Sequence, residues 1–219
     1  PTVGAFSDRL IAEGGTTILT EVPEMFGAET LLMNRCETEE LFEKTVKLIN
    51  DFKNYFTSHG QTIYENPSPG NKQGGISSLE DKSLGCTQKS GSAAVKGVLS
   101  YGEIVSRRGL NLLSAPGNDL VASTALAASG AHMVLFTTGR GTPFASPVPT
   151  VKISSNSPLY EHKKNWIDFD CGPVVSGKAP EELGEELFQY VIDTASGKKV
   201  KAELAGFHDM AIFKQGVTL

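Results

Sequence analysis

The sequence contains no long run of apolar residues and none of the common motifs that mark a nucleotide, zinc or serine-hydrolase site. Its longest apolar run near His132 covers only residues 133–136, whereas a membrane helix needs roughly 18. The patterns HExxH, CxxC, GxSxG, GxxxxGK(S/T) and GxGxxG are all missing. We therefore expect no membrane helix, and the lack of a phosphate-binding loop argues against a nucleotide-binding domain.

Cysteine is scarce and positive charge is not in excess. The three cysteines, Cys36, Cys86 and Cys171, show no paired spacing. An odd number without a framework is typical of a reducing compartment, so we expect a cytoplasmic protein. There are 25 acidic residues against 20 basic ones, for a net charge of -5. This balance argues against nucleic acid or an anionic membrane as the main partner.

What the chain does have is the composition of an ordinary globular protein. Its 219 residues are 39% hydrophobic and 21% charged, which is enough for one large domain with a proper core or for two small ones. We expect a single domain over residues 1–219. Because the first residue is Pro1 and not Met, we also expect the chain to be a fragment of a longer protein or a processed chain.

Stretches with a helical spacing of apolar residues alternate with short stretches rich in β-branched residues. This alternation is typical of an α/β fold with a Rossmann-like, mostly parallel sheet and helices on both faces. Helices are predicted over residues 1–14, 23–34, 38–59, 78–84, 92–105, 119–129 and 180–196, and strands over residues 16–22, 110–115, 132–138, 150–153 and 210–213.

Residues 65–91 form a long polar segment rich in Gly, Pro and Ser. Loops beyond about 12–15 residues are usually functional or disordered, so this segment is a candidate active-site element. Its lysines Lys72 and Lys82 are candidate bases or partners of a substrate carboxylate. Cys86, with Lys89 nearby, is a candidate metal ligand. The plainer interpretation is a pair of solvated lysines and a small buried thiol.

Three predicted strands end in polar residues, and ligands of parallel sheets bind beyond the carboxyl ends of the strands. Glu21 ends the first strand and is a candidate base or metal ligand, or else a solvated carboxylate. Asn118 follows the second, where capping of the next helix would explain it fully. Arg140 follows the third between two glycines, a position suited either to holding a carboxylate or to a plain turn.

The same residues lie in stretches that resemble a known family. The chain is similar to the carboxyl-terminal region of the altronate and galactarate dehydratases, and more so to the altronate members. The resemblance covers nearly the whole chain, with sulfolactate sulfo-lyase as a more distant relative. It is carried by ENPSPGNKQGGISSLEDKSLGCTQKSG, LNLLSAPGND, MVLFTTGRGTP, TEVPEMFGAETLLMNRCE and IFKQGVTL.

The resemblance implies a longer protein in which a small β-clip domain and a middle domain precede this catalytic and metal-binding domain. It implies the dehydration of a sugar acid, D-altronate, to 2-keto-3-deoxy-D-gluconate, with iron(II), sometimes assisted by manganese(II), as cofactor. A homodimer of the complete protein is expected. In such a reaction a base removes the proton next to the carboxylate and an acid protonates the leaving hydroxyl. On position and residue chemistry, we assign Glu21 and Cys86 to the metal, Lys72 and Lys82 to proton transfer, and Asn66, Asn118 and Arg140 to the substrate.

Two alternatives stay open. The isolated chain is either catalytic or a folded domain that only binds metal or assembles with the missing domains. The substrate is altronate or galactarate, because the configuration of one hydroxyl is not visible in composition.

Overall fold

The computed structural model describes residues 1–63, 67, 69–73 and 75–215, and it has the parallel α/β architecture predicted from the sequence. The described strands are shared between two three-stranded sheets, and every strand pair is parallel. One sheet has the order β1 (Thr16–Leu19), β3 (Gly109–Leu113), β2 (Val95–Leu99), and the other has the order β4 (Val134–Thr138), β5 (Thr150–Ser154), β6 (Phe169–Asp170).

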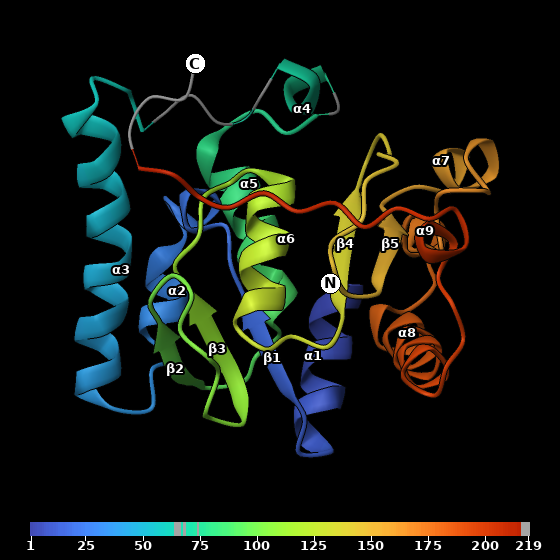
Figure 1. Ribbon diagram of the computed structural model, residues 1–219, viewed down its shortest axis with the longest axis horizontal. Helices are drawn as coiled ribbons and strands as arrows, with labels where there is room; N and C mark the ends of the chain where they lie inside the picture. Colours follow the sequence, from blue (N-terminus) through green and yellow to red (C-terminus); the bar gives the residue numbers. More distant parts are fainter. Residues whose placement is uncertain (64–66, 68, 74, 216–219) are drawn as a thin grey trace.

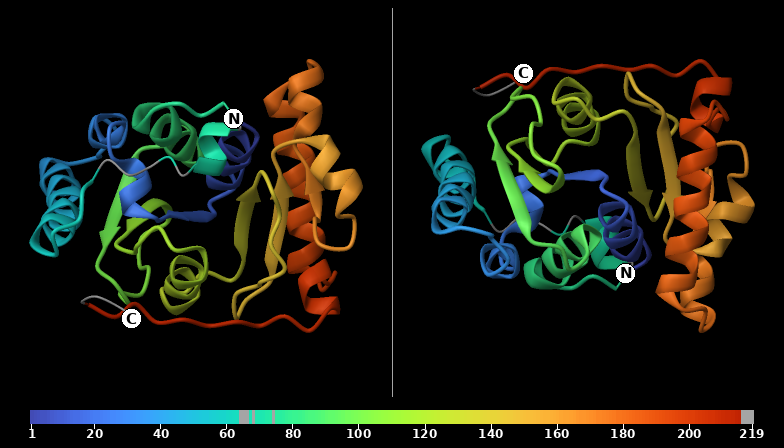
Figure 2. Two further views of the ribbon diagram at one scale, coloured as in Figure 1. Left: turned by 90° about the horizontal axis from the view of Figure 1, so that it is seen from above. Right: turned by 90° about the horizontal axis from the view of Figure 1, so that it is seen from below.

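Helices pack against both sheets. Figures 1 and 2 show α3 and α8 at opposite ends of the molecule, with α1 and α6 between them. The α-helices are α1 (Thr2–Ala12), α2 (Glu29–Met33), α3 (Glu39–Ser58), α4 (Pro69–Gln73), α5 (Leu79–Thr87), α6 (Asp119–Ala128), α7 (Ser157–His162), α8 (Pro180–Ala195) and α9 (Lys201–Leu204), and the 3-10 helices are η1 (Val22–Met25), η2 (Gln88–Ser90) and η3 (Gly172–Ser176).

Each sheet has its own apolar core. The central strands β3 and β5 are buried along their whole length, as expected for parallel strands that are covered on both faces. Helix α1 links the two cores, because Phe6 belongs to the core of the second sheet while α1 also contacts β1. Gly184 lets α8 pack closely against α1: a Cβ atom at Gly184 would lie 2.8 Å from the Cβ of Ala5.

Most of the predicted elements are confirmed, but three are wrong. The helix predicted over residues 92–105 is strand β2, whose alternating burial follows a period of two and which pairs with β3. The helix predicted over residues 23–34 is broken into η1 and α2, with Gly27 between them at a φ of 92°. The strand predicted over residues 210–213 is extended chain without strand pairing.

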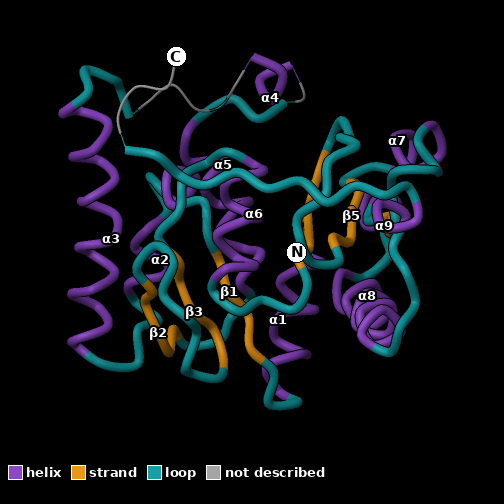
Figure 3. The backbone as a smooth tube through the Cα atoms, in the orientation of Figure 1, coloured by secondary structure: helices purple, strands orange, loops and turns teal. Residues whose placement is uncertain are grey.

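That extended chain, residues 207–215, is a strap across the front of the molecule, drawn red in Figure 1 and as loop in Figure 3. The backbone N–H of Asp209 donates to the Ala145 carbonyl at 2.7 Å, and that of Ala211 donates to Oγ1 of Thr124 at 3.1 Å. Its far end is held where the N–H of Phe213 donates to the Tyr101 hydroxyl at 2.8 Å. The strap therefore connects the second sheet, α6 and the first sheet.

Within the described residues, no helix is long and apolar enough to cross a membrane.

Candidate functional site

Hydrogen bonds join the carboxyl ends of β1 and β3. They place Glu21 and Glu24 at the edge of the first sheet where its strands end. The N–H of Val22 donates to the Ala115 carbonyl at 3.0 Å, and the hydroxyl of Thr20 donates to the Leu113 carbonyl at 3.1 Å. The chain then turns sharply at Glu21, which has a left-handed backbone with φ 64° and ψ 59°, and continues into η1. No other non-glycine residue in the described part of the chain has a positive φ.

Helix α5 brings two side chains of the polar segment to the same carboxylate. Lys82 and Cys86 lie one turn apart on one face of the helix, and both reach Glu24. The Lys82 Nζ lies 2.7 Å from one carboxylate oxygen, and the Cys86 thiol donates to the other at 2.9 Å. The Lys82 and Glu24 side chains are only 14% and 16% exposed. Helix α5 is held in place where the Ser83 hydroxyl donates to the Phe26 carbonyl.

Lys89, in the 3-10 helix η2 that follows α5, completes the group. We call Glu21, Glu24, Lys82, Cys86 and Lys89 the acidic-edge cluster. Lys89 is partly buried, and its charge acts on Glu21, Glu24 and Cys86. Burial lowers the pKa of Lys89, but its acidic neighbours outweigh this effect and raise the pKa above its usual value.

Electrostatics within the cluster separate the two glutamates. Burial, together with the charge of Glu24, raises the pKa of Glu21 to about 7, although Lys89 opposes the shift. For Glu24, the effect of burial is outweighed by Lys89 and by the hydrogen bonds from Cys86 and Lys82, so its pKa lies below the usual value. Burial and the neighbouring carboxylates raise the pKa of the Cys86 thiol to about 12. The cluster thus holds one carboxyl group able to exchange a proton near neutral pH, an ionised carboxylate and a protonated thiol.

Arg140 meets the polar segment at a second place, beyond the carboxyl end of β4 in the second sheet. It is exposed at the end of β4, and its Nη2 lies 3.4 Å from Oε1 of Gln73 in α4. Its guanidinium also covers Gly70, where a Cβ atom would come within 2.6 Å of it. The polar segment therefore reaches both strand ends, with α5 at Glu24 and α4 at Arg140.

Two of the other predicted site residues, Lys72 and Asn118, are exposed. Lys72 is exposed on α4. Asn118 is exposed and caps α6, because its side chain accepts from the N–H of Val121 at 3.2 Å. Asn66 lies outside the described residues. The substrate and proton-transfer roles of all four residues, Lys72, Asn66, Asn118 and Arg140, stay predictions.

The predicted site residues do not include Glu24, Lys89 or Asp119. Asp119 shares the electrostatic environment of Glu24, and its pKa is raised by burial and by Glu24. One signal was available: residues 82, 86 and 89 follow the i, i+4, i+7 spacing of one helix face. No comparable signal connects them to Glu24, which is 62 positions from Cys86.

The assignment of Glu21 and Cys86 as metal ligands stays a prediction. Among the residues that the structure describes, no three His, Cys, Asp or Glu side chains are arranged to hold one metal ion. The Cys86 thiol is also protonated and donates a hydrogen bond to Glu24, while Lys82 pairs with the other oxygen of that carboxylate. Because metals bind the thiolate, this set alone does not fit an iron(II) or manganese(II) site.

Comparison with known proteins gives the relationship of the chain. Residues 1–218 match the family model for the carboxyl-terminal part of D-galactarate/altronate dehydratase. The whole chain is 62% identical to altronate dehydratase of Escherichia coli (strain K12) and 61% identical to that of Bacillus subtilis (strain 168), covering 44% of each relative. Galactarate dehydratase (L-threo-forming) of Escherichia coli (strain K12) is 36% identical over 97% of the chain and 42% of that relative. The chain thus spans less than half of these relatives, and it belongs to the D-galactarate/altronate dehydratase family as a homologue of its carboxyl-terminal region.

Proposed function

We propose that the complete protein removes water from a sugar acid, most specifically D-altronate, to give 2-keto-3-deoxy-D-gluconate. The observation that carries this proposal is the 62% identity to an altronate dehydratase over the whole chain, against 36% for a galactarate dehydratase. The chemistry of the acidic-edge cluster supports it, because the reaction needs one group that accepts a proton and one that donates a proton.

In this proposal, Glu21 acts as the base. This role replaces its predicted assignment to the metal, because the described residues around Glu21 do not by themselves form a metal site. Its ionised carboxylate takes the proton from the carbon next to the substrate carboxylate. Three features suit it to this role: its position at the carboxyl end of β1, its partial burial and its unusual backbone conformation. Burial also brings the pKa of Glu21 to about 7, so that both protonation states are accessible near neutral pH.

Lys82 acts as the acid. Its ion pair with Glu24 at 2.7 Å fixes the position of its ammonium group. The proton that it donates joins the leaving β-hydroxyl and departs as water, while the C–H electrons form the double bond of an enol. The enol then tautomerises to the keto acid. Transfer of a proton from Glu21 back to Lys82 through solvent restores both groups.

Arg140 binds the substrate carboxylate, helped by Lys72 on the adjacent α4, and Asn66 and Asn118 complete the proposed substrate contacts. Arginine suits this role because its guanidinium group can donate two parallel hydrogen bonds to a carboxylate. Iron(II), or manganese(II), is the proposed cofactor of the complete protein, and its ligands would have to include residues beyond those described. The proposed setting is a cytoplasmic homodimer.

The activity is tested by measuring keto-acid release from D-altronate and galactarate, with iron(II), for the full-length protein and for residues 1–219 alone. We expect the full-length protein to dehydrate D-altronate in preference to galactarate. A full-length protein that dehydrates neither acid would refute the proposal. Activity confined to the full-length protein would identify the chain as a domain that depends on the rest of the protein, whereas activity of the chain alone would show that it is sufficient.

The residue roles are tested in the full-length protein with Lys82→Met, Lys72→Met and a matched surface control, Lys44→Met. Lys44 is 54% exposed on α3 and pairs only with neighbouring Glu40 among the described residues. Loss of the acid is expected to lower kcat roughly 100-fold or more, whereas loss of a carboxylate partner at Lys72 should act mainly on KM. Normal kcat in Lys82→Met would remove Lys82 from the mechanism.

A further inference from the structure

A second buried lysine lies outside the acidic-edge cluster and has no part in the proposed reaction. Lys152, in the middle of β5, is only 1% exposed. Its Nζ donates to the backbone carbonyl of Thr142 at 2.7 Å and lies 5.8 Å from the centre of the Phe144 ring. Both partners belong to the loop of residues 139–149, which connects β4 to β5.

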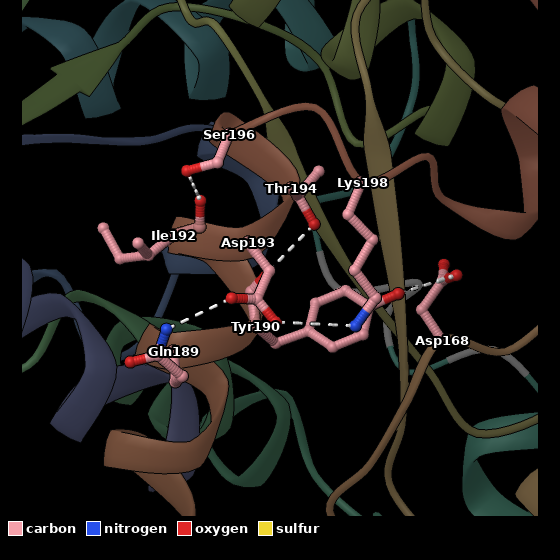
Figure 4. A network of polar contacts seen from close by, with 8 residues as sticks. All are labelled: Asp168, Gln189, Tyr190, Ile192, Asp193, Thr194, Ser196 and Lys198. Carbon is pink, nitrogen blue, oxygen red and sulfur yellow. Dashed lines mark hydrogen bonds and ion pairs between the residues drawn. The ribbon is translucent and has the colours of Figure 1, made fainter.

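The charge of Lys152 is poorly compensated. Asp168 and Asp209 are the acidic groups that act on it, but within the described residues neither forms an ion pair with its Nζ. Asp168 is already engaged: it accepts from the backbone N–H groups of Lys152 and Lys201 at 2.9 Å each, and from the Tyr190 hydroxyl at 3.3 Å. Figure 4 shows Asp168 joined in this way to Tyr190 of α8.

A buried ammonium group with a single hydrogen bond to a carbonyl is expensive, because desolvation of the charge is only partly offset. Burial accordingly lowers the pKa of Lys152 to about 8, against the opposing effect of the two aspartates. A methionine would fill the same space without that cost. The contact with Thr142 therefore needs an explanation other than core stability.

The explanation lies in the loop of residues 139–149, because this loop carries Arg140. Arg140, two residues before Thr142, is the proposed contact for the substrate carboxylate. At the start of the loop, the Thr138 hydroxyl accepts from the N–H groups of Arg140 at 3.3 Å and Gly141 at 2.8 Å. Further along, Ala145 accepts from the strap at 2.7 Å. The hydrogen bond from Lys152 to Thr142 lies between these two attachments along the loop, two residues after Arg140.

We propose that Lys152 is a positioning residue for substrate binding, which holds the loop through the Thr142 carbonyl so that Arg140 meets the substrate carboxylate. This inference rests on the proposed function, in which Arg140 binds that carboxylate. Lys152 itself touches no reacting atom. Its loss should therefore weaken substrate binding and leave the proton-transfer groups of the acidic-edge cluster, at the edge of the other sheet, in place.

The test is a mutant cycle in the full-length protein with D-altronate. Lys152→Met should raise KM roughly tenfold with little change in kcat, since misplacing a binding group by about 1 Å has effects of this order or larger. Arg140→Ala should raise KM more. If Lys152 acts through Arg140, the double variant should be no worse than Arg140→Ala alone. Lys164→Met, at a lysine that is 65% exposed, is the matched control and should leave KM unchanged.

A second measurement does not depend on turnover. Amide hydrogen exchange should become at least several-fold faster at residues 139–145 in Lys152→Met than in wild type, with the strands and α8 unchanged. An unaltered exchange rate in this loop, an unaltered KM, or fully additive effects of the two substitutions would each overturn the inference. A wild-type protein that does not act on D-altronate would refute the proposed function instead. In that case, faster exchange in the loop of Lys152→Met would still support the role of Lys152 in holding the loop.

Discussion

Glu21 shows most directly how one residue can give up stability for a functional position. A non-glycine residue at a φ of 64° is strained, because its Cβ atom crowds the following carbonyl. Its carboxyl group is also buried beside Glu24 and Asp119. Strain of this kind tends to occur at functional sites, where the surrounding structure holds the residue in place.

This strain predicts an inverted order of stability for two substitutions. Glu21→Gly and Glu21→Ala both remove the carboxyl group, but only glycine adopts the left-handed conformation freely. The free energy of unfolding of Glu21→Gly should therefore exceed that of Glu21→Ala by about 1 kcal/mol, measured by urea denaturation. At most helix or strand positions the order is the reverse, so equal stabilities would show that the backbone at Glu21 is unstrained. Both variants should lack dehydratase activity in the full-length protein.

Lys152 predicts a pH dependence of stability. Its pKa is about 8 in the folded chain and 10.5 is the ordinary value, so between these pH values the unfolded chain binds more protons than the folded one. The free energy of unfolding contributed by Lys152 therefore rises as the pH increases through this window, and it is constant and unfavourable below about pH 8.

The measurement is the difference in unfolding free energy between wild type and Lys152→Met, which cancels the titration of other groups. This difference should shift in favour of wild type by about 2 kcal/mol between about pH 7 and pH 10. A difference that does not change with pH would mean that the Lys152 ammonium group is not destabilised by burial.

Among the elements, α5 matters most for the site, because it carries both Lys82 and Cys86 to Glu24. The predicted short helix over residues 78–84 is confirmed and extends to Thr87. It begins at Ser78, whose side chain accepts from the N–H of Asp81 at 3.1 Å. Residues 85–87, which lie beyond the predicted end of the helix, form the turn that places Cys86 against Glu24.

Ser78→Ala should remove this cap and lower the free energy of unfolding by about 1 kcal/mol, as loss of an N-cap usually does. Fraying of the first turn should also loosen Lys82 and reduce kcat in the full-length protein. Ser77→Ala is the neighbouring control: Ser77 is exposed and its hydroxyl donates to the Asp81 side chain, so the expected change is within about 0.5 kcal/mol. Equal effects of the two substitutions would contradict a capping role for Ser78.

For the whole molecule, the carboxyl-terminal strap is the main connection that crosses from one sheet to the other over the front. Phe213 is its anchor at the first sheet. Its ring stacks on Phe52 at 6.4 Å and meets the rings of Tyr55 and Tyr101 edge-on at 5.7 Å each. The strap also supports the loop of Arg140, through Asp209 and Ala145.

Phe213→Ala should therefore destabilise the fold by about 2 kcal/mol, less than for a fully buried aromatic residue because Phe213 is only partly buried. Limited proteolysis should cut residues 207–215 faster in this variant. Ile212→Ala is the control, since Ile212 is 71% exposed and its removal should change stability by less than about 0.5 kcal/mol. Identical unfolding curves for Phe213→Ala and wild type would show that the strap does not hold the two sheets together.

The sequence by itself determined the class of fold, most of the helices and the candidate residues of the rim. These features depend on local signals: caps such as Thr38 and Asn118, helical periodicity, and the strand ends that carry Glu21 and Arg140. The long family-like stretches also determined the family to which the chain belongs. The helix predicted over residues 92–105 failed because strand β2 is selected by its pairing with β3, a contact that local propensity does not contain.

Only the tertiary structure decided which of these residues meet. Glu24 contacts Cys86 across 62 positions of sequence, and the pKa of Glu21 departs from its ordinary value because folding buries it beside Glu24. Lys152 reads as an ordinary lysine within a short strand, and its burial appears only when β5 becomes the centre of a sheet. Desolvation and charge coupling depend on three-dimensional distance, and therefore the composition of the polar segment predicted its importance but not its partners.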